Sequence, residues 1–516
     1  MFIKSASLVR LLPLRAAHIV SLLILFGISS VEVRGQFSPA EGSKLNYRIV
    51  GFSFPARAEA TQYVLELATG SIAGEKEFAA RLYSATSSDK NKIIAEVPSF
   101  GSGYTWRVVY KKNNTVLARG GLHHFETGVI PPSGSEAMRL VTRRDLRNYE
   151  DAYILADGCN VMYDLNGEPV WYLPHNDSIR RLGTNSDIKV SPGGTISFLA
   201  GGTGCEVNYS GQLLWRSGVN NCHHEFNRLR SGHYMALMMG VPGAPAGPEG
   251  GKKFFPQAAI SRLVEFDKDG NIVWSWAGAD YIAGSDLAAL QQQYRNALID
   301  LHENAFYFNE ADSIIYLGMS GISRVVKVSY PSGKVLAEYG NAVSAVMPAA
   351  PGATDDAFNV QRRLQDNQLF RRQHSLQFGT DGYLYLYDNN MELGETGGEI
   401  KNRYPRVLKL QESHGTLEPV WEFDCGPVVC DDRKKLVSGG GGNAMPLPDN
   451  ALFISMCVPY GNMVIADAVK KILWSATMEK YQPASNTWVP AQQYRASIVT
   501  RQQLEEMIWR EQEGIY

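Results

Sequence analysis

Three histidines, His224, His302 and His374, are the residues whose types and spacing point most directly to chemistry. Each opens an apolar segment, which continues into a turn signal and a short β-rich run. In a radial repeat fold, equivalent positions of successive units lie on one ring, so imidazoles roughly 75 residues apart are expected to converge on one axis. We therefore predict that the three imidazoles form a site.

Such a cluster of imidazoles supports three kinds of chemistry. A histidine ligates a metal, transfers a proton, or attacks an electrophile directly. Three inward-facing imidazoles match a zinc or copper site by ligand count, but the short-range spacing of typical zinc ligands is missing from the chain. We therefore predict no cofactor and keep metal binding as an alternative.

Two types of hairpin alternate beyond residue 150 and must position these histidines. The inner type begins at Asp187, at each of the three histidines, and at Asn443. The outer type has a strand, a turn, and a second strand that usually ends in Trp, and we count six copies. These copies occupy residues 161–171, 206–215, 263–274, 325–337, 407–421 and 463–474.

Two hairpins in one unit are what a four-stranded blade requires, so the pattern predicts a six-bladed β-propeller over residues 140–480. A solenoid is the alternative, but a helix-free unit of varying length argues against it. Asp187 and Asn443 take the place of the histidines in the flanking units. We therefore predict that both line the same channel and bind substrate.

The flanking segments have different patterns. Residues 37–128 contain short strand-like runs and a hairpin signal at 111–114, which predict a small immunoglobulin-like β-sandwich ahead of the propeller. Residues 481–516 are predicted to form a C-terminal tail with a short helix. Its signals are a capping box and an apolar stripe, formed by Thr500 with Gln503 and by Leu504, Met507 and Ile508.

The first 35 residues have the pattern of a signal peptide. Basic residues precede an apolar run over 19–31, and small residues precede a cleavage point at Gln36. We expect export to the periplasm or the extracellular space, with an uncleaved signal anchor as the alternative. No later stretch is apolar enough to span a membrane, so we expect no membrane span after cleavage.

The composition of the 516 residues agrees with an exported all-β protein. A formal net charge of -2 gives no reason to expect nucleic acid or an anionic membrane surface as a partner. The 49 glycines and 25 tyrosines favour short strands and tight turns. Of six cysteines, Cys425 and Cys430 are the pair predicted to form a disulfide, because four residues between them close a small loop.

The histidine segments resemble a known family. They read His223-His224-Glu225-Phe226, Asp300-Leu301-His302-Glu303-Asn304 and Gln373-His374-Ser375. Their order and spacing are similar to those of bacterial aryl-sulfate sulfotransferases over roughly residues 140–480, and the front module resembles the β-sandwich that precedes the propeller in that family. The resemblance implies transfer of a sulfuryl group from an aryl sulfate to a phenol, without the nucleotide donor of cytosolic sulfotransferases.

The resemblance also implies roles for the histidines. His374 matches the nucleophile that forms a sulfo-histidine intermediate. His302 matches a residue that binds sulfate oxygens, and His224 one that contacts substrate or exchanges the phenol proton. His223 is the neighbouring candidate for the third position, although the adjacent acidic residue favours His224.

One departure from the family pattern affects the prediction. A Ser-Ser-Arg stretch with a sulfate-binding Arg follows the second histidine in the family, whereas this chain has Met319-Ser320-Gly321. Arg324 is our predicted substitute, with Arg371 and Arg372 as other sources of the charge. The alternative is a non-catalytic propeller that binds a sulfated or phenolic ligand or a protein partner. The sequence does not indicate an oligomeric state.

Overall fold

The computed structural model describes residues 37–131, 137–144, 152–175, 177–239, 261–288, 301–340, 369–393, 400–401, 404–429, 440–456 and 461–514. The predicted signal peptide lies outside the described residues. None of the helices in these ranges is long and apolar enough to cross a membrane. Strands dominate the described residues, so the prediction of an all-β chain is confirmed.

The N-terminal module has two sheets with a shared aromatic and aliphatic core. One sheet has the order β1-β8-β6-β3-β4, with β7 on β6, and the other pairs β2 with β5. The predicted turn at 111–114 joins β6 to β7. The elements are β1 Ser43–Leu45, β2 Ile49–Ser53, β3 Gln62–Thr69, α1 Glu75–Arg81, β4 Leu82–Ser88, β5 Lys92–Glu96, β6 Gly103–Lys112, β7 Thr115–Arg119 and β8 His123–Thr127.

Six further antiparallel sheets follow, and we number them 1 to 6. Sheet 1 has the order β12-β11-β10-β36, from β10 Ala152–Ala156, β11 Val161–Asp164, β12 Pro169–Tyr172 and β36 Ala496–Thr500. Sheet 2 contains β13 Asn185–Val190, β14 Ile196–Ala200, β15 Thr203–Val207 and β16 Leu213–Arg216. Sheet 3 contains β17 Cys222–Arg228, β18 Tyr234–Met239, β19 Ser261–Phe266 and β20 Ile272–Ala277.

The next sheets repeat this meander. Sheet 4 contains β21 Glu303–Asn309, β22 Ile314–Met319, β23 Arg324–Ser329 and β24 Val335–Gly340. Sheet 5 contains β25 His374–Phe378, β26 Leu384–Asp388, β29 Arg406–Ser413 and β30 Thr416–Asp424. Sheet 6 contains β31 Asn443–Pro446, β32 Leu452–Met456, β33 Asn462–Ala466 and β34 Ile472–Gln482, extended by β35 Thr487–Pro490 and β9 Met138–Arg144.

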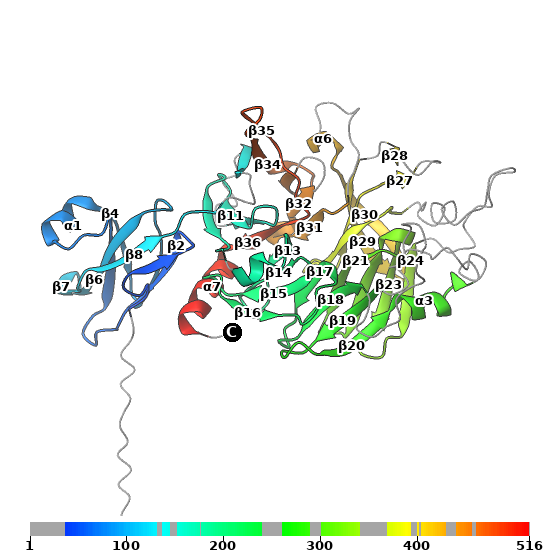
Figure 1. Cartoon of the computed structure of the whole chain (residues 1–516), viewed down its shortest axis with the longest axis horizontal. Helices are drawn as coiled ribbons and strands as arrows, with labels where there is room; N and C mark the ends of the chain where they lie inside the picture. The colour runs from blue at the N-terminus through cyan, green and yellow to red at the C-terminus, as the bar shows by residue number, and fades with distance from the viewer. Residues whose placement is uncertain are drawn as a thin grey trace, which may run out of the picture.

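The remaining described elements are short, apart from one terminal helix. They are α2 Asp177–Arg180, α3 Gly278–Gly284, η3 Ser320–Ile322, the β27 Glu392–Leu393 and β28 Ile400–Lys401 pair, α6 Gly426–Val429, η5 Pro448–Asn450 and α7 Arg501–Glu513. In Figure 1 the N-terminal module lies at one end of the molecule, sheets 3 and 4 lie towards the other, and α7 (red) lies between them.

The inner strands of the six sheets form a closed circuit. We use this term for β36, β13, β17, β21, β25 and β31, each of which contacts the next, while β31 contacts β36. Apolar clusters fill the spaces between consecutive sheets, as between Leu237 of sheet 3 and Phe306 of sheet 4. The inner ends of the strands are thereby brought to a common centre.

Tryptophans of the outer hairpins fasten consecutive sheets to one another. In four of these tryptophans the indole N–H donates to a backbone carbonyl of the next sheet or its loop, which satisfies the only polar atom of the ring. The bonds are Trp171 to Tyr209 O (2.7 Å), Trp274 to Pro331 O (2.8 Å), Trp421 to Ala468 O (2.9 Å) and Trp474 to Leu165 O (2.8 Å).

The C-terminal segment corrects the predicted domain boundary at residue 480. Within it, β36 pairs along its whole length with β10, over 300 residues earlier in the chain. A lone strand has no local hairpin partner, so its pairing leaves no short-range signal in the sequence. The predicted helix is present as α7, with the Thr500–Gln503 capping box formed and the predicted apolar stripe buried.

The N-terminal module packs on sheets 1 and 2 and on α7. The Arg48 N–H donates to Val170 O over 2.8 Å, and Tyr47 forms an isolated bridge with Trp171. Ile49 is buried in the apolar cluster that also contains residues of α7. These contacts attach the module to the side of the circuit where the two chain-distant halves of sheet 1 meet.

Candidate active site at the centre of the inner strands

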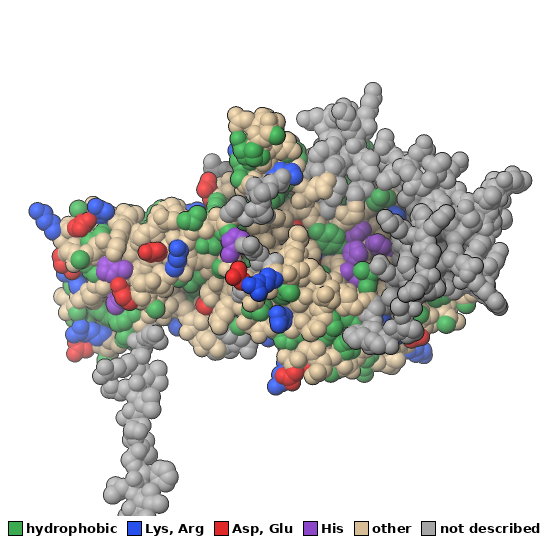
Figure 2. Space-filling model, viewed as in Figure 1, with side chains coloured by type: hydrophobic (Ala, Val, Ile, Leu, Met, Phe, Trp, Pro, Cys, Tyr) green, Lys and Arg blue, Asp and Glu red, His purple; other side chains and the backbone are tan. Residues whose placement is uncertain are grey.

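The rings of the three predicted histidines meet in the structure. The centroid of His224 lies 5.1 Å from that of His302 and 6.4 Å from that of His374. A group of histidine side chains is visible on the circuit of sheets in Figure 2. Side chains from sheets 3, 4 and 5 are therefore within one substrate's reach of one another.

The histidines do not occupy equivalent register positions, which corrects the expectation behind their prediction. His374 is paired with Tyr387 across β25 and β26. His224 lies in an irregular step of β17, between His223 and Phe226, and His302 lies one residue before β21. The rings converge because bulges and strand ends redirect them, since a bulge re-aims a side chain relative to a regular strand.

Unusual backbone conformations accompany this redirection. His224 has a φ of 58° and His302 a φ of 47°, a left-handed region that residues other than glycine seldom adopt. Asp187 has a φ of 58° on β13, and Ser375, directly after His374, has a φ of 52°. Such conformations cluster at functional sites, where the surrounding structure holds them in place.

The hydrogen bonds of His374 define its tautomer. Its Nδ1 lies 2.6 Å from Asn389 Oδ1 and 3.3 Å from Arg372 O. The amide of Asn389 is oriented by its own bond from Nδ2 to Gly441 O, over 3.1 Å. Because both partners of Nδ1 are acceptors, Nδ1 carries the proton and Nε2 keeps its lone pair.

The space beside Nε2 of His374 has a glycine on one side. A Cβ placed on Gly440 would lie 3.9 Å from Nε2 and 3.9 Å from Cε1. Any side chain at this position would therefore grow from a point in contact with the unprotonated nitrogen. Glycine keeps that face of the imidazole accessible.

His223 and His224 form a direct pair. Their Nδ1 atoms are 2.6 Å apart, so one of the two nitrogens carries a proton and the other accepts it. It is His224 whose ring contacts His302 and His374. The structure therefore favours His224 as the member of the cluster and makes His223 its hydrogen-bond partner.

Burial keeps two of the imidazoles neutral. The pKa of His374 is lowered from 6.5 to about 3, mainly by burial, and charge repulsion from Arg495, His302 and Arg372 contributes to this shift. The hydrogen bond to Asn389 acts in the opposite direction and raises this pKa. Burial also lowers the pKa of His224 well below 6.5, with further contributions from His223, the other two histidines and Arg495. Neutral imidazoles with available lone pairs are nucleophiles and proton acceptors.

Two residues of the site are missing from the sequence-based prediction. The ring of Tyr494 lies 6.0 Å from that of His224 and 6.5 Å from that of His374. Arg495, next in the chain, is buried and donates through Nη1 to Asp187 Oδ1 over 2.8 Å. Both residues immediately precede β36. They would have been located at the site only if the pairing of β36 with sheet 1 had been recognised in the sequence.

Asp187 and Asn443 lie beside Arg495 and the start of β36, and the substrate-binding role predicted for them stays a prediction. Asp187 accepts the guanidinium of Arg495 and the N–H of Phe226, the latter over 2.9 Å. Asn443 donates through Nδ2 to Ala496 O over 2.8 Å. Through these contacts, both polar side chains hold the start of β36 in place.

Arg324 is engaged by acidic partners. Its Nη1 lies 3.0 Å from Asp286 Oδ1 and 2.8 Å from Glu338 Oε2, and it also donates to Tyr281 Oη. Gly321, which stands where the resembled family has its Arg, is buried and donates from its N–H to Leu301 O over 2.9 Å. The two carboxylates compensate the charge of Arg324, so its burial is explained by these ion pairs.

The other predicted features have a less direct relation to the site. Among the residues that the structure describes, no group of three or more His, Cys, Asp or Glu is arranged to hold a metal ion. Cys425 is a buried free thiol whose pKa is raised well above its usual value by burial. Its predicted disulfide partner, Cys430, lies outside the described residues, so that disulfide stays a prediction.

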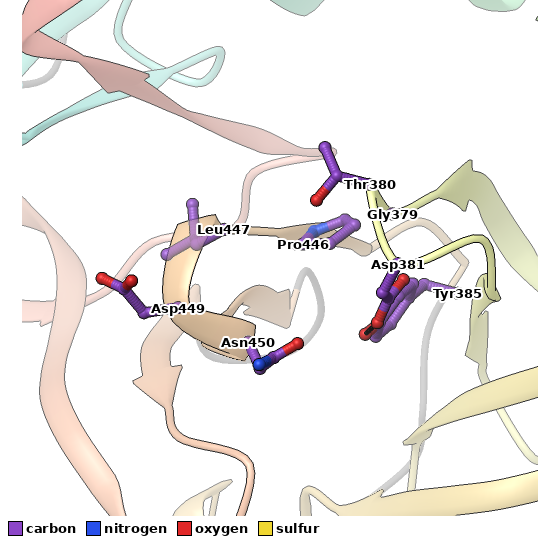
Figure 3. A pocket seen from close by; sticks show the side chains of 8 residues that line it. All are labelled: Gly379, Thr380, Asp381, Tyr385, Pro446, Leu447, Asp449 and Asn450. Carbon is purple, nitrogen blue, oxygen red and sulfur yellow. Dashed lines mark hydrogen bonds between the residues drawn. The ribbon is translucent and has the colours of Figure 1, made fainter.

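A polar pocket lies at the opposite end of β25 from His374, between sheets 5 and 6 (Figure 3). Asp381 in its wall is held by Lys409 at 2.7 Å and by Tyr385 Oη at 2.9 Å. The pocket is separate from the histidine cluster, because the length of β25 lies between them. Its lining residues are Gly379, Thr380, Asp381, Tyr385, Pro446, Leu447, Asp449 and Asn450.

A family model described as Arylsulfotransferase (ASST) matches residues 136–428 of this chain, which include all three histidines. No curated protein matches the sequence. A protein of unknown function from Bacteroides caccae is similar at 11% identity, over 67% of this chain and 98% of that one, with a TM-score of 0.39. Hydrazine synthase of Kuenenia stuttgartiensis is similar at 9% identity, over 65% of this chain and 90% of that one, with a TM-score of 0.34. The likeness to these two structures is too low to support an argument.

Proposed function

Because this chain belongs to the arylsulfotransferase family, we propose that it moves a sulfuryl group from an aryl sulfate to a phenolic acceptor through a sulfo-histidine at His374. The observation that carries the proposal is the hydrogen bond from Nδ1 of His374 to Asn389 Oδ1, at 2.6 Å. With Nδ1 protonated, a neutral imidazole presents the lone pair of Nε2, which is the atom that attacks.

The first half of the reaction loads the enzyme. Nε2 of His374 attacks the sulfur of the aryl sulfate and forms an N–S bond, while the bond from sulfur to the aryl oxygen breaks. The aryl oxide leaves with the bonding electron pair and takes a proton that the His223–His224 pair relays from solvent. Charge develops on the peripheral oxygens during this step, so hydrogen-bond donors around the sulfuryl group stabilise it.

The second half returns the imidazole to its starting state. A phenol gives its proton back through His224, and its oxygen attacks the same sulfur. The N–S bond then breaks, and its electron pair returns to Nε2 of His374. The two halves share one site and one intermediate, so we expect ping-pong kinetics.

The neighbouring histidines support the roles we assign to them. His302 is proposed to donate to the sulfate oxygens, because its ring is 5.1 Å from that of His224 and belongs to the same cluster. His224 is proposed to carry the proton, since it is neutral and its Nδ1 is 2.6 Å from that of His223. A histidine pair of this kind can pass a proton without leaving a net charge in a buried site.

We further propose that the scaffold is a six-bladed β-propeller with an immunoglobulin-like β-sandwich in front of it. The closed circuit of inner strands supports the first assignment, and the two-sheet core of residues 37–128 supports the second. We also propose that the chain is exported, because its first 35 residues have the pattern of a signal peptide.

The test of the proposed reaction is turnover of a chromogenic aryl sulfate with and without excess phenol. We expect phenol-dependent release of the chromophore by the wild type, and a loss on the order of 10³-fold or more in His374→Ala. His233→Ala is the matched control, because His233 pairs with Glu265 at 2.7 Å and lies in the turn between β17 and β18, at the opposite end of β17 from His224. Equal turnover in His374→Ala and His233→Ala would overturn the proposal.

The substitution at Gly321 favours a second candidate function, in which the chain binds a sulfated or phenolic ligand without turnover. The same experiment separates the two candidates. No release by folded wild type over a broad panel of aryl sulfates, together with measurable binding of the same compounds, would favour the binding function.

A further inference from the structure

We propose that Arg495 is the positioning cation of the histidine site, and that it is delivered by the closing strand β36 instead of by the strand after His302. This inference rests on the proposed function. In this role the buried side chain of Arg495 aligns the three histidine segments. It also supplies the positive charge that Gly321 cannot supply.

The first contact of Arg495 is with the segment of His224. Nη1 lies 3.5 Å from Glu225 Oε2, and Glu225 directly follows His224. The same carboxylate accepts the N–H of Phe306 over 3.1 Å, which ties sheet 3 to sheet 4. Arg495 therefore contacts the residue next to His224 through a buried ion pair.

The second contact reaches the segments of His302 and His374. Nη2 of Arg495 donates to Asn304 O over 3.2 Å, two residues after His302. The side chain of Asn304 in turn donates from Nδ2 to Gln373 O over 2.8 Å, directly before His374. A single guanidinium thus connects to all three histidine segments within one or two hydrogen bonds.

The supports of Arg495 are unusually extensive for a side chain at a strand end. Asp187 Oδ1 accepts from Nη1 at 2.8 Å, and the Arg495 N–H donates to Asp157 Oδ2 over 2.8 Å. Burial works against the charge of Arg495, but Tyr494, Glu225 and Asp187 raise its pKa above the ordinary value. The guanidinium therefore stays charged, and its fork geometry suits several fixed acceptors.

This charge affects the histidines as well as their backbone. Arg495 is the largest charge contribution to the lowered pKa of His374, after burial, and it also lowers the pKa of His224. The other groups that act on His374 are His302, Asn389 and Arg372. A buried cation that is itself paired with two carboxylates adds to the effect of burial and disfavours protonation of these imidazoles.

The experiment measures the pH dependence of carbethoxylation of His374 by diethyl pyrocarbonate, followed by peptide mass spectrometry on the full chain. The reagent modifies only the neutral imidazole, so the midpoint reports protonation independently of turnover. The variants are Arg495→Met and Arg495→Lys. The control is Arg107→Met, because Arg107 is equally buried between two carboxylates, Glu66 at 2.6 Å and Glu75 at 2.5 Å, but lies in the N-terminal module.

In the wild type and in Arg107→Met, we expect modification of His374 to continue without loss from about pH 8 down to about pH 5. In Arg495→Met, we expect the midpoint to rise toward the ordinary imidazole value of 6.5. Arg495→Lys keeps the charge but loses the fork, so we expect the wild-type midpoint with a transfer rate lowered about 10-fold or more. An Arg495→Met midpoint equal to that of Arg107→Met would overturn the inference.

Two further outcomes keep this inference separable from the proposed function. If Arg495→Met does not fold, as judged by near-ultraviolet circular dichroism, an unchanged transfer rate in Arg495→Lys overturns the positioning role. If the wild type transfers no sulfuryl group but the midpoint still depends on Arg495, the proposed reaction fails and the positioning role stands.

Discussion

At the scale of single residues, Asn389 sets the reactivity of His374 by accepting its Nδ1 proton. We expect Asn389→Leu to lower kcat/KM for aryl sulfates by roughly 10- to 100-fold, the size found when the hydrogen-bond partner of a metal-ligating imidazole is removed. The reason is that the ring loses the acceptor that fixes its tautomer. Steady-state kinetics checks this, with Asn389→Asp as a comparison that retains an acceptor. A Leu variant with unchanged kcat/KM would contradict the role of Asn389.

His374 also links stability to pH. Its folded pKa of about 3 lies below the ordinary 6.5, so the unfolded chain binds more protons between these values and stability falls as the pH drops through that window. From pH 7 to pH 5, this single group is expected to remove about 2 kcal/mol of unfolding free energy. His374→Gln has no imidazole to titrate at this position. We therefore expect its unfolding free energy to fall by about 2 kcal/mol less than that of the wild type over the same pH range.

Chemical denaturation of both proteins at the two pH values measures the difference. The comparison between wild type and His374→Gln cancels the other titrating groups, among them Asp157, whose pKa is raised to about 7 by burial. Parallel loss of stability in the two proteins would contradict a buried neutral His374.

The sequence identified the three histidines of the cluster but not the polar residues that contact them or their segments. Histidine is a recognisable chemical signal wherever it stands in a repeat. Asn389 and Arg495 are ordinary polar residues in local sequence, and only their hydrogen bonds to His374 and to the histidine segments make them functional. Arg324 was expected to supply the missing charge because it is close to Gly321 in the chain, whereas its guanidinium is held by Asp286 and Glu338.

At the scale of elements, tryptophans of the outer hairpins connect neighbouring sheets through hydrogen bonds of their indole N–H groups. We expect Trp474→Phe to lower the unfolding free energy by about 1–3 kcal/mol, because Leu165 O loses its donor in a fully buried site. Trp274→Phe removes an equivalent bond to Pro331 O, but at a more exposed position, so a smaller cost is expected. Equilibrium denaturation compares the two, and equal costs would contradict the contribution of burial.

The hairpins themselves were predictable because their signals are local. Each outer hairpin joins two strands through a short turn, so alternation and turn residues are read within about 15 residues of one another. The capping box of α7 is local in the same way. In contrast, the pairing of β36 with β10 depends on residues at opposite ends of the chain, and neither strand encodes its partner.

At the scale of the whole molecule, the segment that closes the circuit of inner strands also completes the candidate site. The chain begins sheet 1 with β10 and completes it with β36, and Tyr494 and Arg495 enter the centre directly before that strand. The N-terminal module and α7 pack where this closure occurs, at Ile49 and Leu504. Their position was not predictable, because apolar patterns identify a buried face but not the surface that covers it.

The proposed reaction depends on His374 carrying the sulfuryl group between donor and acceptor. The most direct measurement is rapid mixing of the protein with an aryl sulfate in the absence of phenol, followed by quenching in base and peptide mass spectrometry. We expect an added SO₃ on the peptide that contains His374, discharged on addition of phenol and absent in His374→Ala. Sulfuryl transfer at the normal rate with the added mass on another residue would contradict it, as would transfer with no modified peptide.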